Sequence, residues 1–222
     1  YTNGDKTGEW KYYWRSGQLS EVENYVEGKL EGKDIQYNED GAVEKEMIFK
    51  LGDLEGEYRI YGDAKQLAAV MYYKADELLG YSYEDKNGAL VPMIAVPKGS
   101  GMVTAYYKNG SKSLEMRFNE SLVDGERNLY YSNGKERIVG KRVIGWDNGV
   151  KKLFYPSGKI MKEENYIYGN LHGNSKYYNE NGSLIYDVNF YNGDLHGNCK
   201  YYENGKLTEN LIYYYGMLKE KK

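Results

Sequence analysis

Residues 169–182 read GNLHGNSKYYNENG, and residues 193–205 repeat nearly the same phrase as GDLHGNCKYYENG. The second glycine of this phrase recurs in phase along almost the whole chain, at Gly8, Gly32, Gly56, Gly80, Gly125, Gly149, Gly173 and Gly197. An aromatic side chain follows five residues after most of these glycines. So many positions in phase indicate an internal repeat of about 24 residues, present in about nine copies.

Each copy of the repeat is predicted to form a β-hairpin. The first phrase ends in Asn181-Gly182, and Asn-Gly is the strongest short-range hairpin signal because both residues tolerate positive φ. Apolar side chains then fall on alternate positions, which is the period of a strand with one buried face: Leu184, Tyr186, Val188 and Phe190. A lone hairpin is marginal in water, whereas stacked hairpins pack equivalent rings on one another. The predicted fold is all-β, an elongated array of about nine stacked antiparallel β-hairpins in a single twisted sheet.

The pattern of tyrosines and glycines resembles the MORN repeat in its variant form. The residues that match this pattern best are Tyr166, Gly169, Gly173, Tyr178 and Gly182. Nearly full-length arrays of this variant are similar to the YwqK-family antitoxins. MORN arrays scaffold protein assemblies, and lipid binding has been proposed for some of them, so the resemblance implies binding without catalysis. The antitoxin name implies a toxin as the protein partner.

Composition favours many strands and gives little sign of a charged partner. The chain has 27 tyrosines, which favour strands, and 27 glycines, which permit tight turns, against 3 prolines. Its net charge of −3 provides no long-range attraction for nucleic acid or anionic lipid, so nucleic acid is not expected and membrane association is not supported. The single cysteine excludes an internal disulfide. Because the sequence starts at Tyr1, we interpret it as trimmed or processed and leave cytoplasmic and extracytoplasmic locations and the oligomeric state open.

Residues 92–101, PMIAVPKGSG, interrupt the repeat. Their two prolines lack the N–H that a strand ladder requires. We therefore expect N-terminal hairpin repeats over 1–91, an irregular break or hinge over 92–101, and C-terminal hairpin repeats over 102–222. One interpretation of the break is a bend between two arms; the other is a partner-binding patch built on Met93, Ile94 and Val96.

A second departure from the repeat lies at residues 136–150, ERIVGKRVIGWDNGV. Arg142 occupies a position that is aromatic in other copies, and Trp146 lies inside a turn. Arginine and tryptophan are enriched among the residues that dominate binding energy at protein interfaces. Trp146 is therefore either an interface anchor or a cover for the bare rows beside it.

No catalytic, cofactor-binding or metal site is expected. His172 and His196 occupy equivalent turns, and two ligands do not close a metal site, which usually needs three or four. Cys199 has no histidine or aspartate at a convincing spacing and is interpreted as a structural thiol. Recurring glutamates, Glu21 and Glu23 among them, are interpreted as a solvated strand face with lysine counter-charges.

The favoured function is a non-enzymatic protein-binding repeat scaffold, and its more specific form is an immunity protein that neutralises a toxin. The expected partner-binding residues are Arg142, Trp146, Met93 and Ile94. Two rival functions remain open at this point. A membrane-associated lipid binder should present a face rich in lysine and arginine, and a cell-surface carbohydrate binder should present exposed coplanar rings on which sugars can stack.

Overall fold

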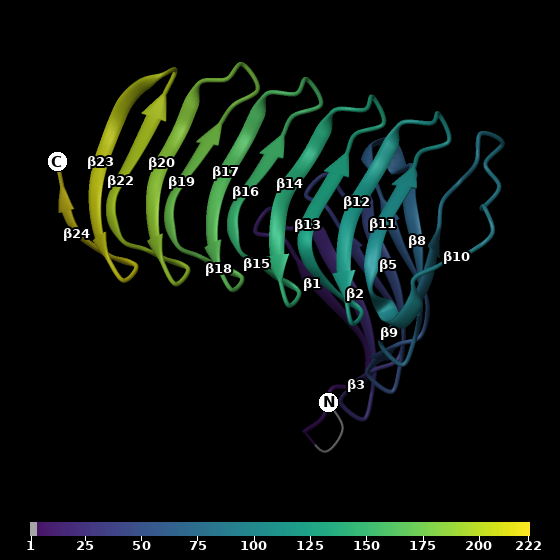
Figure 1. The fold of residues 1–222 in the computed structure, drawn as a ribbon. Coiled ribbons are helices and arrows are strands. Elements are labelled where there is room, and N and C mark those ends of the chain that lie inside the picture. The colour runs from purple at the N-terminus through teal and green to yellow at the C-terminus, as the bar shows by residue number, and fades with distance from the viewer. Residues whose placement is uncertain (1–3) are drawn as a thin grey trace. The chain divides into compact units, whose positions relative to one another are not determined.

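The computed structural model describes residues 4–222 of the chain. These residues contain no α-helix, and their strands form two open antiparallel sheets (Figure 1). The predicted all-β array of antiparallel hairpins is therefore confirmed. The chain divides into two compact units, Tyr1–Leu122 and Val123–Lys222.

The first unit follows chain order along its sheet. The path is β1-β2-β4-β5-β7-β8-β9-β10, while β3 folds back on β2 and β6 on β5; β11 pairs with β12. The elements are β1 (Gly8–Tyr13), β2 (Leu19–Val26), β3 (Lys29–Leu30), β4 (Gly32–Tyr37), β5 (Val43–Lys50), β6 (Asp53–Leu54), β7 (Gly56–Tyr61), the 3-10 helix η1 (Asp63–Lys65), β8 (Leu67–Lys74), β9 (Glu77–Ser82), β10 (Ile94–Ala95), the 3-10 helix η2 (Pro97–Gly99), β11 (Gly101–Tyr106) and β12 (Lys112–Asn119).

The second unit repeats the same construction. Its path is β13-β14-β16-β17-β19-β20-β22-β23-β24, and the two-residue strands β15, β18 and β21 fold back on β14, β17 and β20. The strands are β13 (Leu122–Tyr130), β14 (Glu136–Val143), β15 (Trp146–Asp147), β16 (Gly149–Phe154), β17 (Ile160–Ile167), β18 (Asn170–Leu171), β19 (Gly173–Tyr178), β20 (Leu184–Tyr191), β21 (Asp194–Leu195), β22 (Gly197–Glu203), β23 (Lys206–Tyr214) and β24 (Met217–Lys221).

The Asn-Gly segment that ends the repeated phrase does close a hairpin, but through a longer loop than a two-residue turn. The Gly182 N–H donates to the carbonyl of Asn179 at 2.9 Å, and the Asn179 N–H donates to the carbonyl of Ser183 at 3.0 Å. Gly182 has a φ of 95°, whereas Asn181 is not among the residues with positive φ. Only the glycine of this pair therefore uses the left-handed conformation that makes Asn-Gly a hairpin signal.

The two-residue turns lie at the first glycine of the repeat instead. Between β17 and β18, Tyr168 and Gly169 have φ values of 44° and 81°, and the strands pair directly beside them through Ile167 and Asn170. Positive φ at both central residues defines the turn type whose twist matches a hairpin. Glycine fills the second of these positions in most copies, but Asp76 and Ser121 occupy it with φ values of 65° and 68°, and the first position is filled by larger residues along the chain.

The core of the first unit lies at β8. Five consecutive residues, Leu67–Met71, are buried, so both faces of this strand are covered. The β11–β12 hairpin contacts β8, and the Ser113 hydroxyl donates to the carbonyl of Ala68 at 2.6 Å. The hairpin adds its own buried apolar residues to the unit: Val103, Ala105, Tyr107, Leu114, Met116 and Phe118.

The second unit buries a thinner row of side chains along its sheet. The row comprises Leu129, Ile138, Glu164, Ser175, Val188, Cys199 and Leu211. Neighbouring hairpins contribute successive members, which is the nearest-neighbour packing expected of a repeat array. Burial raises the pKa of the Cys199 thiol, so that the thiol stays protonated, as expected of a structural cysteine.

The single sheet predicted from the sequence is in fact two sheets. The chain passes from one to the other between β10 and β11, inside the irregular stretch 92–101 and within the first compact unit. Pro97 begins η2, and Lys98 takes a φ of 54°, so neither residue continues a strand. The loss of donors and the 3-10 helix explain why the ladder ends here.

The second glycine of the repeat supports a stability prediction. Gly173 has a φ of 87°, whereas Ser175, two residues on, is buried with a hydroxyl that has no hydrogen-bond partner among the described residues. We expect Gly173→Val to lower the free energy of unfolding by about 1–3 kcal/mol, because valine is strained at positive φ. Ser175→Ala removes only the unpaired hydroxyl and should change it by less than about 1 kcal/mol. Chemical denaturation of both variants checks this, and equal losses would contradict a backbone role for Gly173.

Candidate functional site

The tight turns of the second unit lie in a row at one end of its strands, where the short strands β15, β18 and β21 fold back (Figure 1). We refer to this row of strand ends as an edge. The first central residues of four successive turns are Ile144, Tyr168, Asn192 and Tyr215, with φ values of 48°, 44°, 50° and 48°. Asparagine tolerates this conformation, but a β-branched or bulky aromatic residue there is an outlier. Three of these four turns therefore keep a residue that their backbone disfavours.

Large apolar side chains are exposed along this edge. Ile144 is 61% exposed, and Trp146 and Tyr168 are each 62% exposed. We call the following residues the aromatic edge: Ile144, Trp146, Tyr168, Tyr191, Tyr214 and Tyr215, all exposed to solvent. Single exposed apolar residues are ordinary on protein surfaces, whereas a contiguous group of them marks an interaction site.

Contacts between neighbouring turns connect the edge residues. The Trp146 ring lies over Gly169 of the next turn, where a Cβ atom would come within 2.8 Å of ring carbon Cε3. Farther along, the Tyr191 ring lies 5.6 Å from the His196 ring, tilted by 44°, and meets the Tyr215 ring edge-on at 5.5 Å. Trp146, Tyr191 and Tyr215 are therefore held by contacts with neighbouring turns, and the absence of a side chain at Gly169 leaves room for the indole.

The two histidine rings both lie beside Tyr191. The centre of the His172 ring lies 5.0 Å from that of the Tyr191 ring. The centre of the His196 ring, from the next copy of the repeat, lies 5.6 Å from that of Tyr191. The Nδ1 atom of His196 accepts the N–H of Tyr215 at 3.4 Å. Both histidines therefore act as aromatic members beside the edge, as turn residues of equivalent position.

Arg142, the second residue predicted to anchor a partner, is held by an ion pair. Its Nε donates to Asp147 Oδ1 at 2.9 Å, and the Lys151 ammonium donates to Asp147 Oδ2 at 2.7 Å. Burial alone would raise the pKa of Asp147, but the hydrogen bonds from Lys151 and Arg142 hold that pKa below its ordinary value. Arg142 and Trp146 lie on the paired strands β14 and β15, so the ion pair fixes the strand that carries the indole.

Met93 and Ile94 lie in the first unit, at the irregular stretch. Both side chains are exposed. The Ile94 backbone pairs with Tyr81, and Met93 lies against Gly80, where a Cβ atom would come within 2.8 Å of Met93 Cγ. These two residues therefore seat β10 on β9 and also face solvent.

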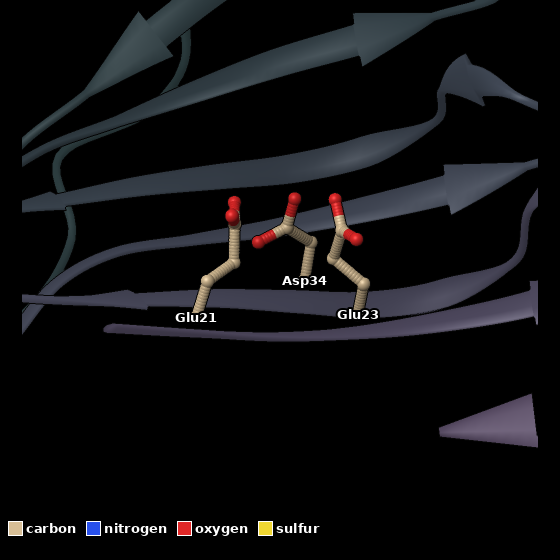
Figure 2. A group of neighbouring side chains, drawn as sticks. All are labelled: Glu21, Glu23 and Asp34. Carbon is tan, nitrogen blue, oxygen red and sulfur yellow. The ribbon is translucent and has the colours of Figure 1, made fainter. Parts of the chain in front are cut away.

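Sequence reasoning missed a group of three carboxylates in the first unit. Glu21 and Glu23 on β2 and Asp34 on β4 point to the same side of the sheet, and Figure 2 shows their carboxylates side by side. One oxygen from each lies within 4.8 Å of the others. Glu21 and Glu23 are half-buried and Asp34 is buried, so the glutamates stand beside a buried carboxylate that the sequence pattern did not indicate. The pairing of β2 with β4 brings the three residues together.

Comparison with known proteins identifies the repeat. Residues 6–27, 147–168 and 171–192 match the family model of the MORN repeat variant. Two of these three segments lie in the unit that carries the aromatic edge. No curated protein matches the chain, so the resemblance to YwqK-family antitoxins is not shown.

One solved structure that the chain matches is entitled "Crystal Structure of TcdB2-TccC3". The identity is 13%, and the match covers 96% of this chain and 16% of that chain with a TM-score of 0.19. At that score the likeness carries no inference about fold or function. Residues 4–222 contain no helix with the length and hydrophobicity needed to cross a membrane.

Proposed function

We propose that this chain is a non-enzymatic repeat scaffold that binds a protein partner through the aromatic edge. The observation that carries the proposal is the group of large apolar and aromatic side chains exposed on successive turns. Ile144, Tyr168 and Tyr215 are exposed to solvent while their backbones occupy positive φ. Positive φ costs a non-glycine residue about 1 kcal/mol or more, and it also occurs at Leu51 of the first unit, so the exposed rings rather than the strain distinguish the aromatic edge.

The chemistry of the edge suits a protein surface. Tryptophan and tyrosine supply large contact areas with few rotatable bonds, and both are enriched among the residues that dominate interface energetics. Trp146 is supported from below by Gly169, and its strand is fixed by the Arg142–Asp147 ion pair. A pre-arranged anchor loses less conformational entropy on binding than a mobile one.

The ring geometry disfavours the carbohydrate alternative. Sugars stack on rings that lie in one plane, but the Tyr191 and Tyr215 rings are inclined by 83° and the Tyr214 and Tyr215 rings by 72°.

A lipid surface is the other alternative to a protein partner. If the chain binds anionic vesicles and Trp146→Ala abolishes that binding, the aromatic edge binds lipid and not a protein. The finer form of the proposal is immunity against a toxin, which the resemblance to YwqK-family antitoxins suggests; a toxin gene beside this one would support it.

Tyr168→Asn is expected to stabilise the chain while it weakens partner binding. Asparagine stands at the equivalent turn position, Asn192, and tolerates positive φ, so the free energy of unfolding should rise by about 0.5–1 kcal/mol. Loss of the ring should weaken binding to the partner by about tenfold, and Trp146→Ala by about 2 kcal/mol or more. The partner is first isolated by pull-down from the native cell, and its affinity for each variant is then measured by calorimetry.

Leu51→Asn provides a matched control. Leu51 occupies the same turn position in the first unit, with a φ of 54° and an exposed side chain. It should give a similar gain in stability without any change in affinity. If Tyr168→Asn and Trp146→Ala bind the isolated partner as tightly as the wild type, the aromatic edge is not the binding surface.

A further inference from the structure

The carboxylates of Glu21, Glu23 and Asp34 form a cluster that the function proposed above does not use (Figure 2). We call these three residues the carboxylate cluster. Asp34 is only 4% exposed, and its Oδ1 atom has no hydrogen-bond partner among the described residues. A buried carboxylate oxygen without a partner loses the full desolvation free energy of that group. It therefore needs either a proton or a cation.

Neighbouring groups satisfy the cluster only in part. The Gln36 side-chain amide donates to Glu21 Oε1 at 2.7 Å, and the Tyr25 hydroxyl donates to Glu23 Oε2 at 2.9 Å. Within residues 4–222, no lysine or arginine forms an ion pair with any of the three carboxylates. Burial, then the charges of Glu21 and Glu23, raise the pKa of Asp34 to about 7, while Lys45 lowers it. Negative charge is thus concentrated here, and Lys45, which acts on Asp34 through its charge, forms no ion pair with the three carboxylates.

One copy of the repeat in the second unit shows what else the same place can contain. Strand pairing sets Glu21 opposite Gln36 on β2 and β4, and Lys162 opposite Tyr177 on β17 and β19. In this register the residues equivalent to the carboxylate cluster are Lys162, Glu164 and Ser175.

At these equivalent positions the one carboxylate is that of Glu164, and neutral groups donate hydrogen bonds to both of its oxygens. Glu164 accepts the hydroxyls of Tyr166 and Tyr177, each at 3.0 Å. The repeat therefore folds with a single carboxylate, a lysine and a serine. The three carboxylates of the first unit are a departure that packing of the repeat does not require.

We propose that Glu21, Glu23 and Asp34 bind a hard divalent cation of the calcium or magnesium type. Such cations take carboxylate oxygens, at about 2.3–2.6 Å for Ca²⁺, so two ligands of one ion lie up to about 5 Å apart. The spread of the three oxygens, within 4.8 Å, fits that limit without movement of the strands. Water completes the coordination from the half-exposed side of Glu21 and Glu23. The ion supplies the positive charge that the cluster lacks and gives Asp34 Oδ1 a partner.

The test is cation-dependent stability of the full chain. After treatment with a chelator, CaCl2 and MgCl2 are compared with NaCl of equal ionic strength. With three protein ligands, we expect a dissociation constant on the order of 0.1–1 mM for the better of the two ions. At ten to a hundred times that concentration the melting temperature should rise by about 3–6 °C. Terbium luminescence sensitised by Tyr25, whose hydroxyl bonds Glu23, gives a second and local readout.

Two variants and one control make the site specific. Asp34→Ser and Glu21→Lys introduce the residue types found at Ser175 and Lys162, which the repeat accommodates, and each should weaken cation binding at least tenfold. Glu46→Gln removes a carboxylate from the opposite face of the same sheet, where Glu46 pairs with Ile35, and should leave binding unchanged.

Two results of the melting experiments would overturn the proposal. If neither ion shifts the melting temperature of the wild type beyond the NaCl control, the cluster is neutralised by protons and there is no cation site. An equal shift in wild type, Asp34→Ser and Glu21→Lys would also overturn it, because the ion then acts elsewhere. Should Asp34→Ser fail to fold, Glu21→Lys and the terbium signal still decide.

Discussion

Leu114→Ala should lower the free energy of unfolding of the first unit by about 3–4 kcal/mol. Leu114 is fully buried, at 0% exposure, and pairs across the hairpin with Ala105, which is also fully buried. Its strand, β12, contacts β8, the strand that is covered on both faces. Removal of the side chain leaves a cavity between two rigid strands, so the neighbours have little freedom to close it.

Leu79→Ala is the matched control, because Leu79 belongs to the same unit but its side chain is 38% exposed. It should cost less than about 1 kcal/mol. Urea denaturation followed by circular dichroism compares the two variants, and a constant slope against urea shows that only stability has changed. Equal losses for both variants would mean that the β11–β12 hairpin does not complete the core of this unit.

The hairpin array was predictable because it depends on local signals that repeat. Positive φ at the turns explains the spacing of the glycines, and strand geometry explains the alternation of the apolar residues. Both patterns recur in most copies of the repeat. The burial of β8 was not predictable in the same way. Leu67–Met71 is an uninterrupted apolar run, which is consistent with a strand buried on both faces, but its second cover comes from β11–β12, which lies 30 or more residues away in the sequence.

The candidate sites show a similar division. Trp146 was recognisable as an irregular residue inside a turn, and it is among the most exposed large side chains of its unit. Arg142 drew the same interpretation, yet its guanidinium is held by Asp147, five residues along the chain, on the paired strand. The carboxylate cluster was missed because Asp34 joins Glu21 and Glu23 only through the register of β2 with β4. Pairing between strands, rather than residue type, decides these cases.

Gly80→Ala should destabilise the first unit by about 2–3 kcal/mol, although alanine usually stabilises a strand relative to glycine. Gly80 is in phase with the glycines that need positive φ, but it is not one of the positive-φ residues itself. Its constraint is proximity. It pairs with Tyr72 on one side and Ala95 on the other, and an added Cβ would lie 2.6 Å from the carbonyl oxygen of Ile94.

The clash has a side-chain part and a backbone part, which a second substitution separates. The added Cβ would also meet Met93 Cγ at 2.8 Å, and that contact disappears in Met93→Ala. The contact with the Ile94 carbonyl does not, so Gly80→Ala with Met93→Ala should recover only part of the loss. In Gly80→Ala we also expect faster hydrogen exchange at the Val96 N–H, which donates to the carbonyl of Leu79 at 2.9 Å, because the clash loosens this contact.

Gly140→Ala tests whether proximity, and not a general dislike of alanine in these strands, is the cause. Gly140 lies in strand β14 without positive φ, and its nearest contact to an added Cβ is Lys151 Cγ at 3.4 Å, an ordinary distance to a flexible side chain. This substitution should change the free energy of unfolding by no more than about 0.5 kcal/mol. If Gly80→Ala is equally mild, or if Met93→Ala restores it completely, then the backbone of β10 yields to the methyl group. In that case β10 is not held on β9 by the close approach of their backbones, and the exposed pair Met93 and Ile94 sits on a strand that is free to shift.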